Sequence, residues 1–321
     1  MRSQIIDIAK GIAIVLVVIG HYYPDNSPCW YKGLHEIIYS FHMPLFLFCS
    51  GYVYKFENLR EYPKFILKKI RRLIIPYIVT SVIIILIKLL TERFMYVENP
   101  VSCESFFRIF YYPEAGYFLW FIWSLWLIFI VFPFFSINQT RRNWLYAVVF
   151  LLSYIPIQWT EIFCVNQTIH MARYFVMGML IFDYRNFVLP LNRIPKIVPI
   201  LLFFTGFTMR ENVLINELLP YLGVWMTLVI STKISQRDNW INKVIMTISI
   251  ASYIIYLFHT TFEGFAKGVL HKFPLFMAGG DVSMFILGAS IIIISGIIFP
   301  IALYKYVIRK YYFTRFLFGI K

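Results

Sequence analysis

The sequence has few charged residues, and acidic ones are the scarcer kind. Among 321 residues only 14% are charged, with 16 acidic side chains against 30 basic ones, whereas soluble proteins carry about 25% charged residues. Hydrophobic residues make up 60% of the chain and aromatic residues 20%. A soluble fold of this length has no core large enough for so much apolar surface, but a lipid bilayer can hold it. The composition therefore excludes an ordinary soluble domain and predicts an integral membrane protein.

Other absences narrow the class further. The chain has four cysteines, and none shows C-x-x-C or metal-ligand spacing, so we predict no metal site. Cys29, Cys103 and Cys164 fall in loops on one predicted side of the membrane, where a disulfide can form, but the sequence does not choose a pair. We find no internal repeat, low-complexity tract or long linker, and interpret residues 1–321 as a single domain. The first apolar run, 5–23, lacks the basic n-region and the A-x-A-like site of a signal peptide, so we expect it to be a retained helix.

The apolar runs predict an all-α, polytopic membrane protein of about ten transmembrane helices, because a span needs roughly 20 mostly apolar residues. We place these helices at approximately 5–23, 36–54, 73–91, 117–137, 144–159, 169–183, 195–210, 213–231, 244–260 and 282–305.

Lysine and arginine are distributed unevenly between the two sides of this arrangement. With the N-terminus inside, the cytoplasmic segments hold 22 of the 30 basic residues and the outer loops hold 6, while Lys88 and Arg173 fall within spans. Acidic residues show the opposite bias, with 11 outside and 5 inside. Because cytoplasmic loops are enriched in lysine and arginine, both termini are predicted to be cytoplasmic. The net charge of +14 thus follows from topology, and a nucleic-acid partner is excluded, since the basic residues are not gathered on one soluble domain.

Ionisable groups inside spans are costly and indicate function. In the first span, Lys10 and His21 are eleven residues apart, which is 20° past three helical turns, so both lie on one face about 16 Å apart along the axis. With Lys10 at the cytoplasmic interface, His21 lies near the middle of the bilayer. Asp7 precedes Lys10 by three residues and can pair with it. The alternative is that His21 only hydrogen-bonds a neighbouring helix.

The second span contains His35 and His42, seven residues apart, and then the small residues Ser50 and Gly51. His42 precedes Met43-Pro44, and this proline is expected to kink the helix and free a backbone carbonyl. Small residues most often allow close helix packing, and Ser50 is expected to pack or to line a ligand site, since no serine nucleophile arrangement is readable.

A basic run, Lys68-Lys69-Ile70-Arg71-Arg72, ends the longest cytoplasmic loop and directly precedes the third span. Such a run is usually a topology signal. The competing interpretation is an anion site for a phosphorylated cofactor, because Lys69 and Arg72 at i and i+3 would present two cations on one face.

Three later spans carry further polar side chains. Trp120 lies in the first turn of the fourth span, and Arg173 lies within the sixth, where it must face protein or water. In the ninth span Ser252, Tyr256 and His259 form a polar stripe at i, i+4 and i+7. Together these positions predict several helices that turn polar faces toward one buried cavity.

The set of motifs resembles the acyltransferase-3 family of bacterial membrane O-acyltransferases. The order and spacing agree from residue 7 to residue 259, and the predicted ten spans fit as well. Two departures are lysines in place of the family's arginines, at Lys10 and at Lys69; both keep the charge but lose the bidentate guanidinium fork. The stretches that carry the resemblance are Asp7-x2-Lys10-Gly11 with His21, Phe41-His42-Met43-Pro44-Leu45-Phe46 with Ser50-Gly51, Lys69-x2-Arg72-Leu73-x2-Pro76-Tyr77, Leu119-Trp120-Phe121, and Ser252-Tyr253-x2-Tyr256-Leu257-x-His259.

The resemblance implies an enzyme that moves an acyl group from cytoplasmic acyl-CoA to a hydroxyl of a cell-envelope carbohydrate. His21 would be the general base or a transient acyl carrier. Lys10 would attract CoA phosphate or stabilise the thioester carbonyl oxygen. The nucleotide phosphates would be held by Lys69 and Arg72, with Lys68 and Arg71 beside them. The substrate would be lined by His42, Ser50, Trp120, Arg173, Tyr253, Tyr256 and His259.

The same resemblance predicts acetyl-CoA as donor, a carbohydrate or lipid-linked glycan as acceptor, and a location in the bacterial cytoplasmic (inner) membrane. The sequence does not specify the acceptor or its reacting hydroxyl, the choice of acetyl over succinyl, or the oligomeric state. Two other classes compete with the enzyme. A lipid-linked glycan transporter or flippase would also need polar cavity faces and cytoplasmic cations, without CoA chemistry. A scaffold for envelope assembly would need no buried ionisable groups, so the charges inside the spans argue against it.

Overall fold

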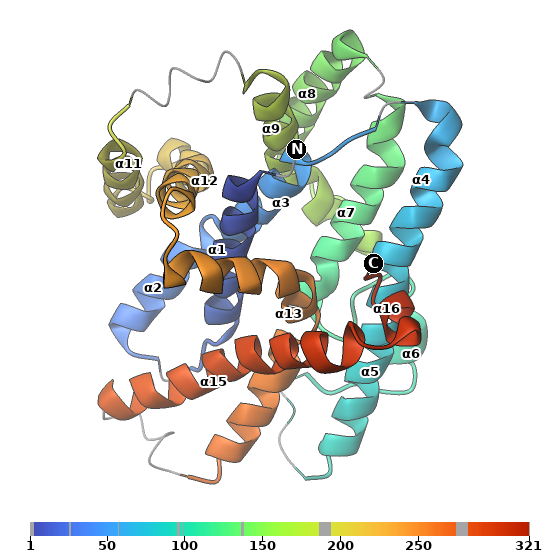
Figure 1. Ribbon diagram of the computed structural model, residues 1–321, viewed down its shortest axis with the longest axis vertical. Coiled ribbons are helices and arrows are strands. Elements are labelled where there is room, and N and C mark those ends of the chain that lie inside the picture. Colours follow the sequence, from blue (N-terminus) through green and yellow to red (C-terminus); the bar gives the residue numbers. More distant parts are fainter. Residues whose placement is uncertain are drawn as a thin grey trace. The chain divides into compact units, whose positions relative to one another are not determined.

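The computed structural model describes residues 3–25, 27–56, 58–94, 97, 99–135, 138–185, 194–273 and 282–320 (Figure 1). Every regular element in these ranges is a helix, so the predicted all-α fold is confirmed. The chain divides into two compact units. The first unit contains residues 1–53 and 177–301, and the second contains residues 54–176 and 302–321.

Six helical segments of the described residues are long and apolar enough to cross a membrane, which agrees with the prediction of a polytopic membrane protein. These segments are α1 (Gln4–His21), Leu59–Thr91 with α4 (Tyr62–Lys69) and α5 (Ile75–Thr91), Tyr117–Phe134 with α7 (Trp120–Val131), α12 (Val213–Ser235), α13 (Trp240–Leu270), and Val282–Ile308 with α15 (Val282–Leu303). The other predicted spans correspond to shorter or less apolar helices, namely α2 (Cys29–Tyr39), α3 (His42–Tyr52), α8 (Gln139–Ser153), α9 (Val165–Asp183) and α11 (Ile197–Thr208).

Helix α1 is packed on several sides within the first unit. It contacts α2, α3, α12 and α13, and its Ala9 and Ala13 are fully buried in a cluster with Phe48 of α3. A small residue also sets the distance to α13, because a Cβ atom added at Gly11 would lie 2.7 Å from Ile245. The polar side chains of α1 are therefore held among protein helices, as the cost of ionisable groups in lipid requires.

The second predicted span, 36–54, is divided into α2 and α3. Phe41 interrupts the helix with φ −147° and ψ −10°, and α3 begins at His42. Pro44 falls in the first turn of α3, where its missing N–H costs nothing because the first backbone N–H groups of a helix have no partner inside it. The interruption thus comes before the proline, whereas the sequence predicted a kink at it.

Small residues bring α9 close to α3, also within the first unit. The contact is made by Gly178 of α9, where an added Cβ would overlap the carbonyl oxygen of Phe48 and lie 2.7 Å from the backbone nitrogen of Tyr52. Ser50 instead donates its hydroxyl to the carbonyl of Phe46, 2.9 Å away on its own helix. The close approach expected near Ser50 therefore depends on a glycine of the neighbouring helix.

In the second unit, the basic run is part of a long helical segment and not the end of a loop. Helix α4 covers residues 62–69, a π-helical turn (Ile70–Ile74) follows, and α5 continues from Ile75. The helical segment thus begins at Leu59, well before residue 73 where the predicted span starts, and its first part, α4, packs against α7. The C-terminal turn covers the π-helical turn: Gly319, with φ +62°, lies where an added Cβ would be 2.8 Å from the carbonyl oxygen of Arg71.

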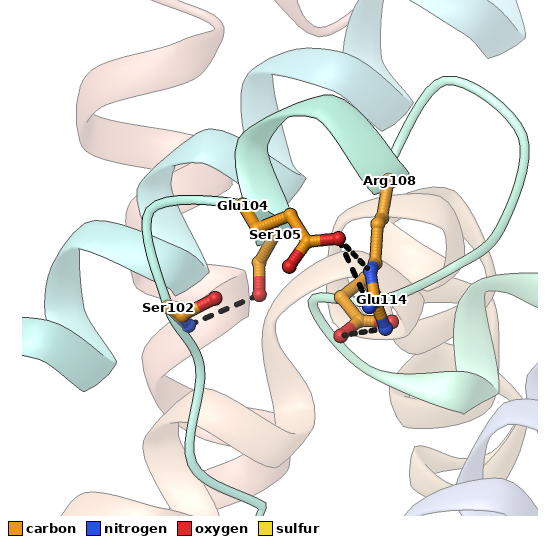
Figure 2. A network of polar contacts seen from close by, with 5 residues as sticks. All are labelled: Ser102, Glu104, Ser105, Arg108 and Glu114. Atoms are coloured by element: carbon orange, nitrogen blue, oxygen red, sulfur yellow. Dashed lines mark hydrogen bonds and ion pairs between the residues drawn. The ribbon is translucent and has the colours of Figure 1, made fainter.

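A polar network orders the loop that follows α5 in the second unit (Figure 2). Arg108, at the end of the short helix α6 (Ser105–Arg108), donates to Glu104 at 3.0 and 3.1 Å and lies 3.7 Å from Glu114. The hydroxyl of Ser105 accepts a bond from the backbone N–H of Ser102. Because Arg108 and Glu104 are largely exposed, this network fixes the loop and adds little stability.

Candidate active site

The centre of the candidate site is a pair of histidines in the first unit. His21 is the last residue of α1, and His259 lies in the middle of α13, with their ring centres 4.9 Å apart and the ring planes at 60°. His259 is completely buried. His35, His42 and Lys267 also lie within electrostatic reach of His21. The sequence predicted both members of the pair as site residues, but it gave no indication that they face each other.

Hydrogen bonds to the backbone fix the proton on two of these rings. The Nδ1 atom of His259 lies 3.1 Å from the carbonyl oxygen of Ile255 and 2.9 Å from that of Tyr256. The Nδ1 atom of His42 lies 2.9 Å from the carbonyl oxygen of Ile38. A carbonyl oxygen only accepts, so each Nδ1 is the donor and carries hydrogen. In the neutral rings, Nε2 therefore has the lone pair.

His35 occupies the end of the site near the C-terminus of α1. Its ring is stacked between Tyr23 and Tyr39, with centroid distances of 4.1 and 4.0 Å. It also bonds to the backbone of Gly20, the residue before His21. His35 was noted in the sequence only for its spacing from His42, and the structure ties it to the end of α1.

Two charged residues of the site were missed at the sequence level. Helix α13 continues to residue 270, whereas the predicted span ends at 260. Glu263, only 3% exposed, lies one turn beyond His259, and Lys267 lies one turn beyond Glu263. Both continue the polar stripe of Tyr256 and His259 in steps of four residues. That periodicity was the signal that could have found them; both residues lie beyond residue 260, where the predicted span ends.

Lys10 and His21 keep the relationship predicted from their spacing. Helix α1 runs unbroken from residue 4 to 21, so the two Cα atoms are separated by about 16 Å along one face. Asp7 is buried in the first turn of α1. Both Asp7 and Lys10 lie within electrostatic reach of Cys49 on α3. The N-terminal end of this face of α1 therefore also lies within the protein.

Tyrosines of α13 occupy two sides of the helix. The ring of Tyr256 lies 6.4 Å from that of His259. Tyr253 lies on a different side, and its buried hydroxyl has no hydrogen-bond partner among the residues that the structure describes. Buried polar groups are nearly always paired, so a hydroxyl of this kind is a candidate for contact with a ligand.

The predicted cations of the phosphate site lie in the second unit. Lys69, at the end of α4, places its Nζ atom 3.3 Å from the ring centre of Phe129 and 5.1 Å from that of Phe65. Arg72 is half-buried in the π-helical turn, while Lys68 and Arg71 are exposed. Lys69 and Arg72 lie within electrostatic reach of each other. The two cations nevertheless differ in surroundings, which the sequence did not distinguish.

The remaining predicted lining residues of the second unit are Trp120 and Arg173. Trp120 is half-buried at the first position of α7. Arg173 lies over the ring of Tyr154 at 4.4 Å and donates to the hydroxyl of Tyr174 at 3.0 Å. As expected from its position within a span, the guanidinium faces protein. The four cysteines are free, and the described residues contain no group of three or more His, Cys, Asp or Glu side chains arranged to hold a metal.

An all-helical fold with six helical segments long and apolar enough to cross a membrane defines a multi-pass membrane protein, and the rings of His21 and His259 lie 4.9 Å apart among its helices. The comparison with known families specifies the class: the family model described as "Acyltransferase domain" matches residues 4–305, and the chain belongs to this family, acyltransferase 3. It is therefore a membrane acyltransferase.

Two curated relatives share a short region with the chain. Nodulation protein NolL of Mesorhizobium japonicum is 42% identical over 65 residues, which is 19% of this chain and 17% of that protein. Nodulation protein NolL of Sinorhizobium fredii is 42% identical over 57 residues, 16% of each chain. The match thus spans less than a fifth of the length of these relatives. No solved structure matches the chain.

Proposed function

We propose that this acyltransferase moves an acetyl group from cytoplasmic acetyl-CoA to a hydroxyl of a cell-envelope carbohydrate, with His21 as the reacting base. The observation that carries the proposal is the position of His21 at the end of α1, against the fully buried His259. Histidine is the side chain whose basicity suits the removal of a hydroxyl proton near neutral pH. A location in the bacterial inner membrane belongs to the same proposal.

The proposed transfer needs one base that gives its proton back. His21 takes the proton of the acceptor hydroxyl while the hydroxyl oxygen forms a bond to the thioester carbonyl carbon. The carbon–sulfur bond breaks, and the CoA sulfur takes the proton from His21, which returns to neutral. If His21 instead carries the acetyl group, its ring nitrogen attacks the thioester carbonyl carbon and the CoA thiolate leaves. The acceptor hydroxyl oxygen then attacks the acetyl-histidine, the bond to the ring nitrogen breaks, and the hydroxyl proton passes to the CoA thiolate. Both routes place His21 next to the reacting carbonyl group.

Lys10 fits a phosphate of the donor better than the thioester oxygen. The separation of about 16 Å from His21 exceeds the reach of a lysine side chain, which is roughly 6 Å. Side chains of a helix also lean toward its N-terminus, so Lys10 extends away from His21. We assign it the attraction of a CoA phosphate at the cytoplasmic end of α1.

Cations of the second unit are also proposed to bind the donor. Arg72 is assigned to the nucleotide phosphates, because its fork of N–H groups matches phosphate oxygens and it is half-buried. Lys69 is assigned the same ligand, in competition with the ring of Phe129 that it now contacts. Lys68 and Arg71 are exposed and add positive charge around these residues.

The acceptor is assigned to polar and aromatic side chains that the donor does not use. The hydroxyl of Tyr253, buried and without a partner among the described residues, is suited to bond a sugar hydroxyl. His42, Tyr256 and Trp120 are the other lining residues that we propose, together with Ser50 and Arg173.

The test uses purified protein in nanodiscs with acetyl-CoA labelled in its acetyl group. The wild type is expected to release CoA slowly in the absence of acceptor, or to retain label on the protein. His21→Ala should abolish both while the helical circular dichroism stays unchanged. Arg72→Ala should raise the KM for acetyl-CoA. If the wild type neither binds nor consumes acetyl-CoA, even with a cell-envelope glycan extract present, the proposal fails and a glycan carrier without CoA chemistry takes its place.

A further inference from the structure

Three aromatic rings are stacked beside the end of α1 in the first unit. The ring centre of His35 lies 4.1 Å from that of Tyr23 and 4.0 Å from that of Tyr39, with the ring planes 30° and 26° apart. Two rings at this distance cannot share one face of an imidazole, so the tyrosines cover its opposite faces. His35 is therefore the middle member of a row of three rings, which we call the aromatic stack.

The backbone of Gly20 holds the aromatic stack next to His21. His35 is hydrogen-bonded to the backbone of Gly20, and a Cβ atom added at Gly20 would lie 2.9 Å from the Cε2 atom of Tyr39. The missing side chain of Gly20 thus lets the ring of Tyr39 lie directly on α1. Gly20 is the residue before His21, and Tyr23 follows His21 by two residues. The stack is therefore attached to the chain on both sides of the proposed base.

The aromatic stack is accessible, although its rings contact each other. Tyr23 is 42% exposed and Tyr39 is 45% exposed. His21 is itself partly exposed, whereas His259 is completely buried. A ligand can therefore contact the two tyrosines and the proposed base. The predicted topology places this end of α1 on the outer side of the membrane, which is the side of a cell-envelope carbohydrate.

The chemistry of the stack matches that of a sugar ring. A pyranose has faces made of C–H groups and a rim of hydroxyl groups. The π face of a tyrosine is negative and attracts the C–H groups, while the phenol hydroxyl can donate or accept a hydrogen bond at the rim. A tyrosine also has few rotatable bonds, and packing against the histidine restricts them before a ligand binds. Binding therefore costs little conformational entropy.

We propose that the aromatic stack binds the sugar ring whose hydroxyl receives the acyl group. The inference rests on the proposed function and adds the residues that hold the acceptor beside His21. Tyr23 and Tyr39 contact the sugar. His35 acts through them, because it keeps their rings in place, and is a positioning residue.

Tyrosines at a membrane surface also occur as a belt of rings at the level of the lipid headgroups. Trp30 provides a comparison for that role, because it lies on α2 like Tyr39 and is 47% exposed. Its ring contacts Tyr31 and Phe285, whereas Tyr39 contacts the rings of His35 and His42. Trp30→Leu is therefore the matched control for the loss of an exposed ring on this helix.

The experiment measures the transfer of labelled acetyl groups from acetyl-CoA to a cell-envelope glycan extract by full-length protein in nanodiscs. The extract is varied at saturating acetyl-CoA. We expect Tyr23→Leu and Tyr39→Leu to raise the half-saturating extract concentration about tenfold, because each loses an aromatic face. Tyr23→Phe and Tyr39→Phe keep that face and should raise it by only about threefold, for the loss of one hydroxyl. Trp30→Leu should match the wild type.

Two variants of His35 test the positioning role. His35→Ala removes the middle ring and should raise the half-saturating extract concentration as much as the leucine variants do. His35→Phe keeps a flat ring between the tyrosines and should recover most of this loss. The KM for acetyl-CoA should change by no more than about threefold in all these variants, which shows that the donor site is intact. If Tyr39→Leu does not fold, Tyr23→Leu still tests the stack, because Tyr23 lies in the loop after α1.

An unchanged half-saturating concentration in Tyr23→Leu and Tyr39→Leu, or an equal rise in Trp30→Leu, would overturn the inference while the acyltransferase assignment stands. A wild type that consumes acetyl-CoA but labels no carbohydrate in the extract would overturn it together with the carbohydrate acceptor. A wild type that does not consume acetyl-CoA would instead overturn the proposed function, and the inference with it.

Discussion

The Nδ1 atom of His42 lies 2.9 Å from the carbonyl oxygen of Ile38, so a side chain of α3 bonds across the break to the last turn of α2. The carbonyl also accepts from the backbone N–H of Phe41 at 3.2 Å. Both groups are buried. The hydrogen bond therefore replaces one that a continuous helix would have made.

Loss of this bond should cost stability more than chemistry. We expect His42→Leu to lower the free energy of unfolding by about 0.5–1.5 kcal/mol, the net worth of one hydrogen bond, because the Ile38 carbonyl keeps its backbone donor. His42→Asn, which can present an N–H near the same place, should lose less. Thermal unfolding in detergent measures both, with acetyl-CoA consumption alongside. An inactive His42→Asn of wild-type stability would show instead that His42 takes part in the reaction.

Lys69 and Arg72 should respond differently to removal, although they carry the same charge. Because the Lys69 ammonium faces the rings of Phe129 and Phe65, Lys69→Met should reduce stability by about 0.5–2 kcal/mol through lost cation–π contacts. Arg72→Ala should raise the KM for acetyl-CoA about tenfold or more, as expected for a bond to a charged phosphate. Steady-state kinetics and thermal unfolding of both variants test these two expectations. A larger rise in KM for Lys69→Met than for Arg72→Ala would reverse the two roles.

Gly178 and Gly264 provide a paired test of helix packing. Gly178→Ala would force a Cβ into the carbonyl of Phe48 and should destabilise the protein by about 1–3 kcal/mol, as overpacking does. Gly264 of α13 has no atom within 4 Å of an added Cβ. There alanine should stabilise by roughly 0.5–1 kcal/mol, because glycine in a helix interior is the more flexible residue. Equal unfolding midpoints for the two variants would mean that α9 and α3 are not in contact.

The sequence predicted those features that depend on local periodicity. The 3.6-residue repeat was enough to put Lys10 and His21 on one face of α1, because that helix is unbroken. The stripe of Tyr256 and His259 on α13 was found in the same way. Composition was sufficient to predict a membrane protein, because a soluble fold of this length has no core large enough to bury so much apolar surface.

Features that depend on a partner helix were missed or misplaced. The predicted span ends at 260, before Glu263, but α13 continues to residue 270, and Glu263 is buried within the first unit. The interruption at Phe41 comes before Pro44, and nothing local at that position marks it. The ring of Phe129 over Lys69 joins residues sixty positions apart, which no local pattern reveals. Tertiary contact therefore decided the helix ends and the surroundings of the cations.

Cysteine labelling tests the predicted orientation of the chain. Cys29 and Cys103 are exposed and are predicted to lie on the outer side, whereas Cys164 is fully buried. Burial raises the pKa of the Cys164 thiol to about 12, so this group stays protonated as the pH rises from 7 to 9 and does not become a thiolate nucleophile. In single-cysteine variants, a membrane-impermeant maleimide should label Cys29 and Cys103 in intact cells. Cys164 should react only after denaturation, at either pH.

Labelling of Cys29 and Cys103 that required permeabilised cells would place these loops in the cytoplasm. The termini would then lie outside, and the phosphate-binding roles proposed for Lys10 and Arg72 would be untenable, because acetyl-CoA is supplied from the cytoplasm.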